Sequence, residues 1–303
     1  KLGLSIRGSF YDNEKSNPEW AKASYNGIDV SKSNSSFGAN GKTMDNQNWT
    51  FGTGLTFTPN ENHTIKADFD VAKQKYDNSQ GSVGTLDSRE SLLFYSGNGA
   101  TKTYSPRVGY TEYQRMEREQ YSLAWEANWG IGKSTVGIHH IESENLGRSL
   151  PLNASERARM ETLYGNLGLT KNAKNQWTGA AKGYNDLNAA DKAFIDSLLP
   201  RPTRTLESSD TTYSAKYEVP LSNHFLVVGA EYKEAELKDG VYKDGKKEYN
   251  QYGVFAEDNW NIIDPLTLTL GTRYDKHEDF GDNVSPRVYA TYAINDNWTV
   301  KGG

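Results

Sequence analysis

The sequence predicts an all-β protein whose antiparallel strands cross a membrane as the wall of an up-and-down barrel. Three features of the 303 residues predict this class: side chains alternate between apolar and polar, short turns alternate with long loops, and aromatic residues are many while long aliphatic residues are few. Aromatic residues make up 12% of the chain, although all hydrophobic residues together reach only 35%. A disordered chain would lack the aromatics, and a soluble globular chain would carry more aliphatic residues in its core.

Alternation of side chains is the dominant pattern. In residues 49–58 the odd positions hold mostly large apolar side chains, and the even positions hold only threonine or glycine. Such a period of two is that of a strand with one apolar face. The same alternation marks residues 2–10, 65–72, 121–129, 213–219, 226–232, 252–260, 266–274 and 288–294. We therefore expect about eleven strands, each about 8 to 16 residues long.

The connections between these strands also alternate. Short turns are predicted at residues 59–62, 130–133, 220–223, 263–265 and 295–297. Long loops are predicted near residues 13–46, 79–111, 147–205 and 239–247, with a shorter one at 278–283. A membrane barrel has tight turns on the periplasmic side and long loops outside, whereas a soluble sandwich has no reason to segregate its loops by length.

Aromatic residues cluster beside the short turns. Phe57, Trp129, Trp260 and Trp298 each lie within about two residues of a short turn and on the apolar side of their strand. This arrangement is typical of the aromatic girdle at a membrane interface, where an amphipathic ring lies at the level of the lipid headgroups. The alternative for each residue is that it is an ordinary aromatic side chain packed in a hydrophobic core.

One stretch departs from the β pattern. Residues 153–199 are rich in alanine, and Asn188 is a suitable N-cap for a helix over 189–199, with Pro202 shortly after it. We expect one or two short helices here. Because both flanks are predicted strands, the helices belong to an insertion of about residues 147–205 in one extracellular loop rather than to a separate domain.

Composition excludes several functions. The chain has no cysteine, and its net charge of -5 argues against nucleic acid as a partner. The longest purely apolar stretch, residues 225–230, is far shorter than the roughly 20 residues of a spanning helix. No metal site is expected, because only His139 and His140 are close in sequence and neighbours on a strand point to opposite faces. No nucleophile or acid/base pair indicates an enzyme.

The residues from 250 to 303 carry a resemblance to a known family. The segments Phe255–Trp260 (FAEDNW), Leu266–Asp275 (LTLTLGTRYD), Phe280–Gly281 (FG), Ser285–Arg287 (SPR) and Thr299–Gly303 (TVKGG) resemble the barrel of TonB-dependent siderophore receptors, in the group of the colicin I and ferric enterobactin receptors. The resemblance implies a barrel of about 22 strands plugged by an N-terminal domain. Residues 1–303 would supply about the third to the thirteenth strand, without the plug, the segment that contacts TonB, or the C-terminal strands.

The resemblance also implies a function. The parent protein would take up a ferric siderophore of the catecholate type across the bacterial outer membrane, coupled to the TonB complex through the plug. Its other partners would be outer-membrane lipid and lipopolysaccharide, and a colicin or phage could exploit it. Three alternatives stay open: a passive outer-membrane channel, a TonB-dependent receptor for another substrate such as haem, and a soluble all-β enzyme acting on carbohydrate.

Cations and aromatic rings are the expected contacts for an anionic, flat ferric catecholate. The preferred pair is Arg115 and Arg118, of which Arg118 aligns with an arginine of the enterobactin-type receptors. Tyr104, Tyr110 and Tyr113 lie nearby in the sequence and could stack on catechol rings. The alternative is that these arginines bridge lipopolysaccharide or neighbouring strands.

The loop at residues 147–205 is a second candidate region. It holds nine Lys or Arg and five Asp or Glu, a net charge of +4 within a chain of net charge -5. This local reversal favours an anionic ligand. Arg148, Arg201 and Arg204 lie near the ends of the loop and are predicted to face the lumen or vestibule.

Overall fold

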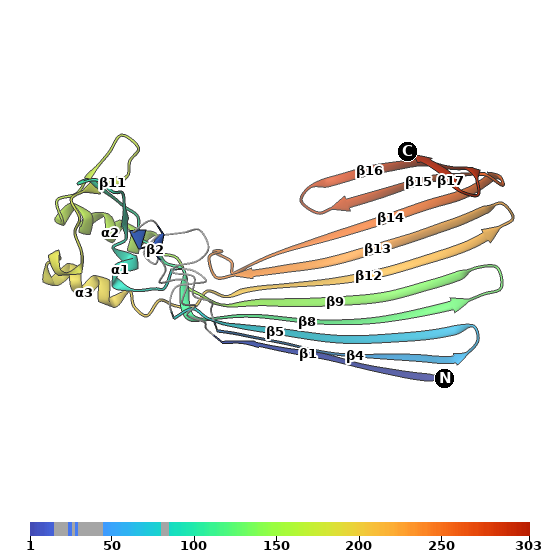
Figure 1. The fold of residues 1–303 in the computed structure, drawn as a ribbon, viewed down its shortest axis with the longest axis horizontal. Helices are drawn as coiled ribbons and strands as arrows, with labels where there is room; N and C mark the ends of the chain where they lie inside the picture. The colour runs from blue at the N-terminus through green and yellow to red at the C-terminus, as the bar shows by residue number, and fades with distance from the viewer. Residues whose placement is uncertain (15–23, 26–27, 30–44, 80–84) are drawn as a thin grey trace.

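The computed structural model describes residues 1–14, 24–25, 28–29, 45–79 and 85–303, and most of them lie in one long antiparallel sheet (Figure 1). Within the described residues the sheet has eleven strands, and each strand pairs with the next one along the chain. This is the up-and-down order that was predicted. The strands are β1 (Leu2–Asn13), β4 (Asn46–Asn60), β5 (His63–Asp77), β8 (Tyr110–Asn128), β9 (Lys133–Arg148), β12 (Leu206–Leu221), β13 (His224–Asp239), β14 (Lys246–Ile263), β15 (Leu266–His277), β16 (Gly281–Asn295) and β17 (Trp298–Gly302).

The register of the strands divides their side chains into two faces, because cross-strand partners lie on the same side of a sheet. One continuous row of partners across five strands is Leu55, Ala67, Leu123, Ile138 and Tyr213. We call the side that carries this row the apolar face. Its large hydrophobic side chains are mostly exposed, since no second layer of the described chain covers them.

The opposite side, the polar face, carries a series of ion pairs. They join Arg7 to Asp70, Lys66 and Lys133 to Glu126, Lys233 to Asp210, Arg273 to Glu231, and Arg287 to Glu257. Gly52 lies beneath the pair of Arg7 and Asp70, where a Cβ would overlap both side chains. Charged groups that need water therefore gather on one side of the sheet, and apolar groups gather on the other.

Short turns and long connections lie at opposite ends of the strands, as predicted (Figure 1). The tight turns β4 to β5, β8 to β9, β12 to β13, β14 to β15 and β16 to β17 share one end. The connection from β1 to β4, predicted at residues 13–46, falls largely outside the described residues, apart from the short paired segments β2 (Ser24–Tyr25) and β3 (Ile28–Asp29).

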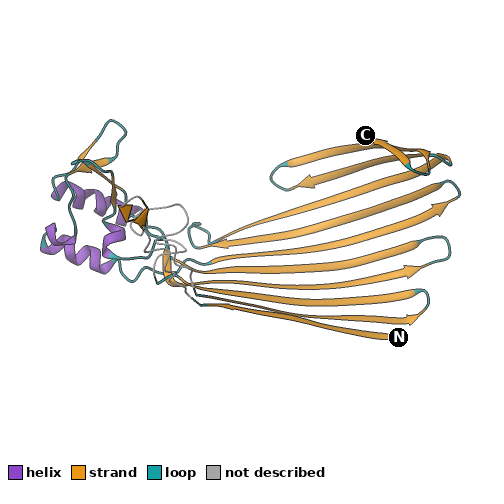
Figure 2. Ribbon diagram, in the orientation of Figure 1, coloured by secondary structure: helices purple, strands orange, loops and turns teal. Residues whose placement is uncertain are grey.

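The two longest connections within the described residues fold together into one compact unit, which we call the cap (Figure 2). The connection before β8 supplies α1 (Arg89–Leu92), β6 (Tyr95–Ser96) and β7 (Lys102–Tyr104). The connection before β12 supplies α2 (Ala154–Asn166), β10 (Thr170–Lys171), β11 (Trp177–Gly179), a 3-10 turn at Tyr184–Asp186 and α3 (Ala189–Ser197). A small sheet in the order β10, β11, β7, β6 combines strands from both connections.

The cap holds the main buried hydrophobic cluster of the described residues. Its members come from both connections and are Leu92, Leu93, Tyr104, Leu152, Met160, Leu163, Tyr164, Leu169, Leu187, Ile195 and Leu198. The predicted helix after Asn188 is confirmed, because the Asn188 side chain accepts a hydrogen bond from the backbone N–H of Asp191 at the start of α3. Among the described residues no helix, α2 included, has the length and apolar character needed to cross a bilayer.

Candidate ligand-binding site

Tyr104 ties the two halves of the cap together. Its ring is 4% exposed, and its hydroxyl donates a hydrogen bond to the Ala180 carbonyl at 2.7 Å and accepts one from the Lys182 backbone N–H at 2.6 Å. Burial raises the pKa of this hydroxyl above its ordinary value. The ring also packs against Tyr95 and Tyr164. Tyr104 therefore holds the cap together from inside rather than presenting its ring to a ligand.

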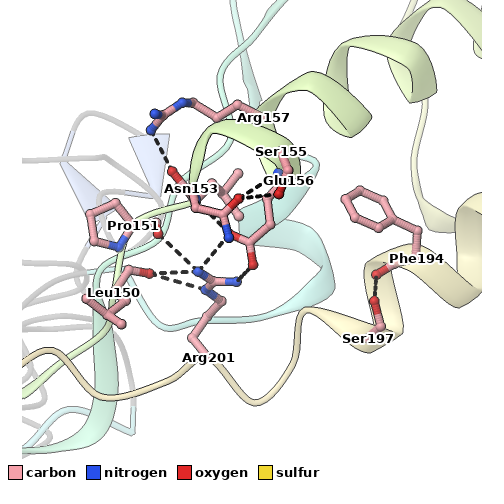
Figure 3. Close-up of polar contacts among 10 residues, drawn as sticks. Leu150, Pro151, Asn153, Ser155, Glu156, Arg157, Phe194, Ser197 and Arg201 are labelled. Carbon is pink, nitrogen blue, oxygen red and sulfur yellow. Dashed lines mark hydrogen bonds and ion pairs between the residues drawn. The ribbon is translucent and has the colours of Figure 1, made fainter. Parts of the chain in front are cut away.

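An ion pair between the buried Arg201 and the partly exposed Glu156 closes the base of the cap (Figure 3). The guanidinium of Arg201 meets the Glu156 carboxylate at 2.9 and 3.1 Å and also donates to the carbonyl oxygens of Leu150 and Pro151. Burial alone would raise the pKa of Glu156, but the bonds from Arg201 and from the Asn153 backbone N–H together outweigh it, and the pKa lies below its usual range. Glu156 in turn accepts a bond from the backbone N–H of Asn153 at the start of α2.

A second polar centre joins α2 to α3. The carboxylate of Asp191 is 1% exposed and accepts hydrogen bonds from Arg159 at 2.6 Å, Asn166 at 2.9 Å and Asn188 at 2.7 Å. Burial acts to raise the pKa of Asp191, but the bonds from Asn166 and Arg159 prevail, and the pKa is lowered. Buried charges of this kind are tolerated only when they are fully paired. The cap is therefore fixed by polar contacts as well as by its apolar core.

One side of the cap opens into a small cleft in which cations and aromatic rings lie close together. This cap cleft has a volume of about 250 Å³ and is lined by Glu90, Leu93, Phe94, Tyr95, Lys182, Gly183 and Tyr184. The Arg89 guanidinium lies 4.3 Å from the centre of the Tyr184 ring, and the Arg107 guanidinium lies 3.5 Å from that of Phe94. Both distances are within the range of a cation–π contact. The cleft thus combines flat apolar surface with one lining cation, Lys182, and one lining carboxylate, Glu90. Lys182 is paired with Asp186 at 3.6 Å, and the nearby Arg89 is paired with Asp196 at 2.7 Å.

The arginines predicted at the ends of the 147–205 loop have structural partners. Arg201 does not face a lumen, because its side chain is only 3% exposed and is enclosed by Glu156 and two carbonyls. Arg204 forms a bidentate ion pair with Asp239, in which two guanidinium nitrogens donate to the two carboxylate oxygens at 2.7 and 2.6 Å. Arg148 lies over the ring of Tyr110, 5.2 Å from its centre, where β8 and β9 reach the cap.

Arg115 and Arg118 are not brought together. Both lie on β8, but their positions differ by an odd number of residues, so they point to opposite faces of the sheet. Arg115 shares the side of the apolar face with its partner Lys75, whose ammonium lies 5.0 Å from the Tyr113 ring centre. Arg118 is exposed on the polar face. Its role in ligand binding stays a prediction.

The four aromatic residues predicted for a girdle lie at the short-turn end of the apolar face. Trp129 contacts Trp125 edge to face and donates a hydrogen bond to Ser134, and Trp260 stacks on His224. Phe57 and Trp298 lie on the same side of β4 and β17 and are exposed. Their contact with a membrane interface stays a prediction.

A second aromatic row, which the sequence analysis missed, ends the apolar stretch on six neighbouring strands. Its members are Tyr121, His140, Tyr213, Tyr232, Tyr252 and Tyr274. We call it the tyrosine row. It lies about eight residues from the short-turn tryptophans, or about 20 Å across a bilayer for a strand tilted by about 40°. This repeated spacing, as between Trp129 and Tyr121, is the sequence signal that could have revealed the row.

Among the described residues, no group of three or more His, Cys, Asp or Glu side chains is placed to hold a metal ion.

Over almost its whole length the sequence matches a known family. Residues 3–303 match the family described as TonB dependent receptor-like, beta-barrel. The chain belongs to this family. TonB-dependent receptors are non-enzymatic proteins of the outer membrane, so the predicted class, location and lack of catalytic chemistry are confirmed.

Known TonB-dependent receptors are similar to this chain at low identity. It is 24% identical over 298 residues to the probable TonB-dependent siderophore receptor PirA of Acinetobacter baumannii, covering 91% of this chain and 33% of that protein. It is 22% identical over 247 residues to the ferrienterobactin receptor of Escherichia coli, covering 71% of this chain and 28% of that protein.

The fold is also shared with solved receptors. The ferric enterobactin receptor of Pseudomonas aeruginosa in complex with enterobactin superposes with a TM-score of 0.56 at 18% identity, covering 85% of this chain and 33% of that one. The chain spans about a third of the length of these relatives. In this family the apolar face meets lipid and the polar face lines the lumen.

Proposed function

We propose that this chain is the middle part of the wall of a receptor that takes up a ferric siderophore of the catecholate type. The proposal is supported by the family, by relatives that are named siderophore and enterobactin receptors, and above all by the cap cleft. The missing portion of the receptor would supply the plug, the contact with TonB and the strands that pair with the free edges of β1 and β17. An open sheet edge cannot persist in a bilayer.

The chemistry of the cap cleft suits such a ligand. A ferric catecholate is anionic, and each of its arms ends in an aromatic ring. Lys182 lines the cleft, and Lys192 lies 5.7 Å from the centre of the Tyr184 ring. At about 250 Å³ the cleft is smaller than the usual pocket for a whole small molecule, so we expect it to take one catechol arm. On this view the cap, as an extracellular insertion, makes the first contact.

The polar face offers a second contact further along the path. Arg118 is exposed on this face near the middle of β8, without an ion pair among the described residues. It is therefore available to an anion that moves from the cap into the lumen. Attachment of a colicin or phage stays a prediction, because no contact in the cap bears on it.

The test is ligand binding by the full-length receptor in detergent, measured as quenching of tryptophan fluorescence by ferric enterobactin. We expect micromolar or tighter binding, and about a tenfold weaker affinity for Lys182→Glu at low salt, because the change places a like charge beside the anion. Lys174→Glu is the matched control, since Lys174 is an exposed lysine in a cap turn away from the cleft.

Two outcomes would contradict the proposal at different levels. Equal affinities for wild type, Lys182→Glu and Lys174→Glu would remove the cap cleft from the binding site but leave siderophore uptake standing. A receptor that binds no ferric chelate at any concentration up to millimolar, while conducting ions in planar bilayers, would favour the passive channel.

A further inference from the structure

The cap cleft carries a negative charge that no neighbouring group of the cap compensates by direct contact. Its lining holds two charged side chains, Lys182 and Glu90. Lys182 is paired with the carboxylate of Asp186, which lies outside the lining. Glu90 is exposed in the first turn of α1, and no hydrogen bond or ion pair engages its carboxylate within the described residues. An anion that enters the cleft therefore meets one shared positive charge and one carboxylate.

Arg89, the neighbour of Glu90 in the chain, is engaged elsewhere. Its Nε donates a hydrogen bond to the Asp196 carboxylate at 2.7 Å, and its guanidinium lies over the ring of Tyr184. The Tyr184 hydroxyl donates to the same carboxylate at 2.7 Å. These contacts hold Arg89 against one wall of the cleft, so that it acts on Glu90 by charge alone, without a hydrogen bond.

Other cations beside the cleft are engaged with its aromatic walls. The Lys102 ammonium donates to a backbone carbonyl at 2.7 Å and lies 5.9 Å from the centre of the Tyr95 ring. The Arg107 guanidinium covers the ring of Phe94. Neither cation is among the residues that line the cleft. These contacts fix the rings in place, but they provide no partner for the carboxylate of Glu90.

A ferric catecholate is a poor match for this lining unless it brings a hydrogen-bond donor of its own. On a neutral scaffold the complex has an excess of negative charge, because the catecholate oxygens outweigh the ferric ion. Like charges that face each other across a binding site weaken binding. An ionised carboxylate also needs hydrogen-bond donors, since it can only accept. A protonated amine next to the catechol ring removes both costs at once.

We propose that Glu90 makes the cap cleft selective for catecholates whose arms carry a protonated amine. The ring of one arm packs against the aromatic walls, and the amine on its linker donates a charge-assisted hydrogen bond to Glu90. Lys182 remains for the catecholate oxygens. This inference rests on the proposed function, because it names the class of catecholate that the same cleft takes.

The test compares two ferric tris-catecholates with identical rings. One is ferric enterobactin, whose scaffold has no amine, and the other is a synthetic complex with a lysine side chain beside each ring. Both are titrated against the full-length receptor in detergent at low salt, with quenching of tryptophan fluorescence as the readout. We expect the wild type to bind the amine-bearing complex about tenfold more tightly. Glu90→Gln should lose most of this preference, and Glu90→Lys should prefer ferric enterobactin.

Glu161→Gln is the matched control. It removes the same charge from an exposed carboxylate of α2 that does not line the cleft, so the preference of the wild type should survive it. Equal affinities of the wild type for both complexes, or a preference that persists in Glu90→Gln, would overturn the selectivity but leave siderophore binding standing. Binding of neither complex would overturn the proposed function itself. Heat-modifiable migration on gels checks that each variant is folded.

Discussion

Replacing Leu163 by alanine tests whether the cap is one cooperative unit. Leu163 is on α2 and is fully buried in the cluster that includes Leu92 and Tyr104 from the other connection. Truncating a fully buried leucine costs about 2 to 5 kcal/mol, and about 1.4 kcal/mol corresponds to a factor of ten. Local opening of the cap should therefore become about thirtyfold to several thousandfold more frequent.

Hydrogen exchange of the full-length receptor, followed by mass spectrometry of peptides, measures this opening. Faster exchange is expected in α2 and α3 and also in α1, β6 and β7, because both connections share the core. The β15 to β16 hairpin should exchange as in the wild type. Thr162→Ala is the control, since Thr162 is an exposed residue of the same helix. If acceleration stops at α2 and α3 and leaves residues 89–104 unchanged, the two connections are separate units and our reasoning is wrong.

Two further predictions concern the polar contacts of the cap. Arg201→Met leaves the partly exposed Glu156 without its partner and should lower the local stability of the cap by about 1 to 3 kcal/mol, whereas Arg157→Met should have a much smaller effect. The same exchange experiment decides, and equal effects would contradict the prediction. The lowered pKa of Asp191 contributes stability that is present above the unfolded value of about 3.9 and lost as the pH falls through the folded value. Protection of α2 and α3, corrected for intrinsic rates, should thus be constant from about pH 7 to 5 and fall below about pH 4. Asp191→Asn should make this fall smaller, and the lowered pKa of Glu156 accounts for part of what remains.

The wall of the barrel could be predicted from the sequence, because its strands lie between two environments, lipid and water, and this produces a simple pattern of side chains. A strand between lipid and water alternates with a period of two, and segments such as residues 49–58 and 266–274 show it directly. The positions of the short turns could be predicted from the same pattern. The tyrosine row was missed because it is a property of six strands at once, and its members become neighbours only through the register.

The cap was predictable only in part. The Asn188 cap and the alanine-rich run are local signals, so α3 was found at its first residue. That residues 89–104 pack against α2 and α3 depends on contacts between residues far apart in the sequence, such as Tyr104 with Tyr164, and no local pattern encodes them. The same limit applies to Arg201. From the sequence alone it was predicted to contact a ligand, because nothing in the sequence shows that it pairs with Glu156.

The sheet exposes its apolar face, whereas the cap has a buried core of its own. One polypeptide therefore folds in contact with two solvents, lipid and water. In the cap, a leucine is held inside because water rejects it, and shortening it leaves a void. On the wall of the folded barrel, a leucine faces hydrocarbon, and a lipid tail can fill the space that a shorter side chain leaves. Substitution tables derived from water-soluble proteins should therefore describe the cap and fail for the wall, and the boundary between the two regimes runs along the tyrosine row.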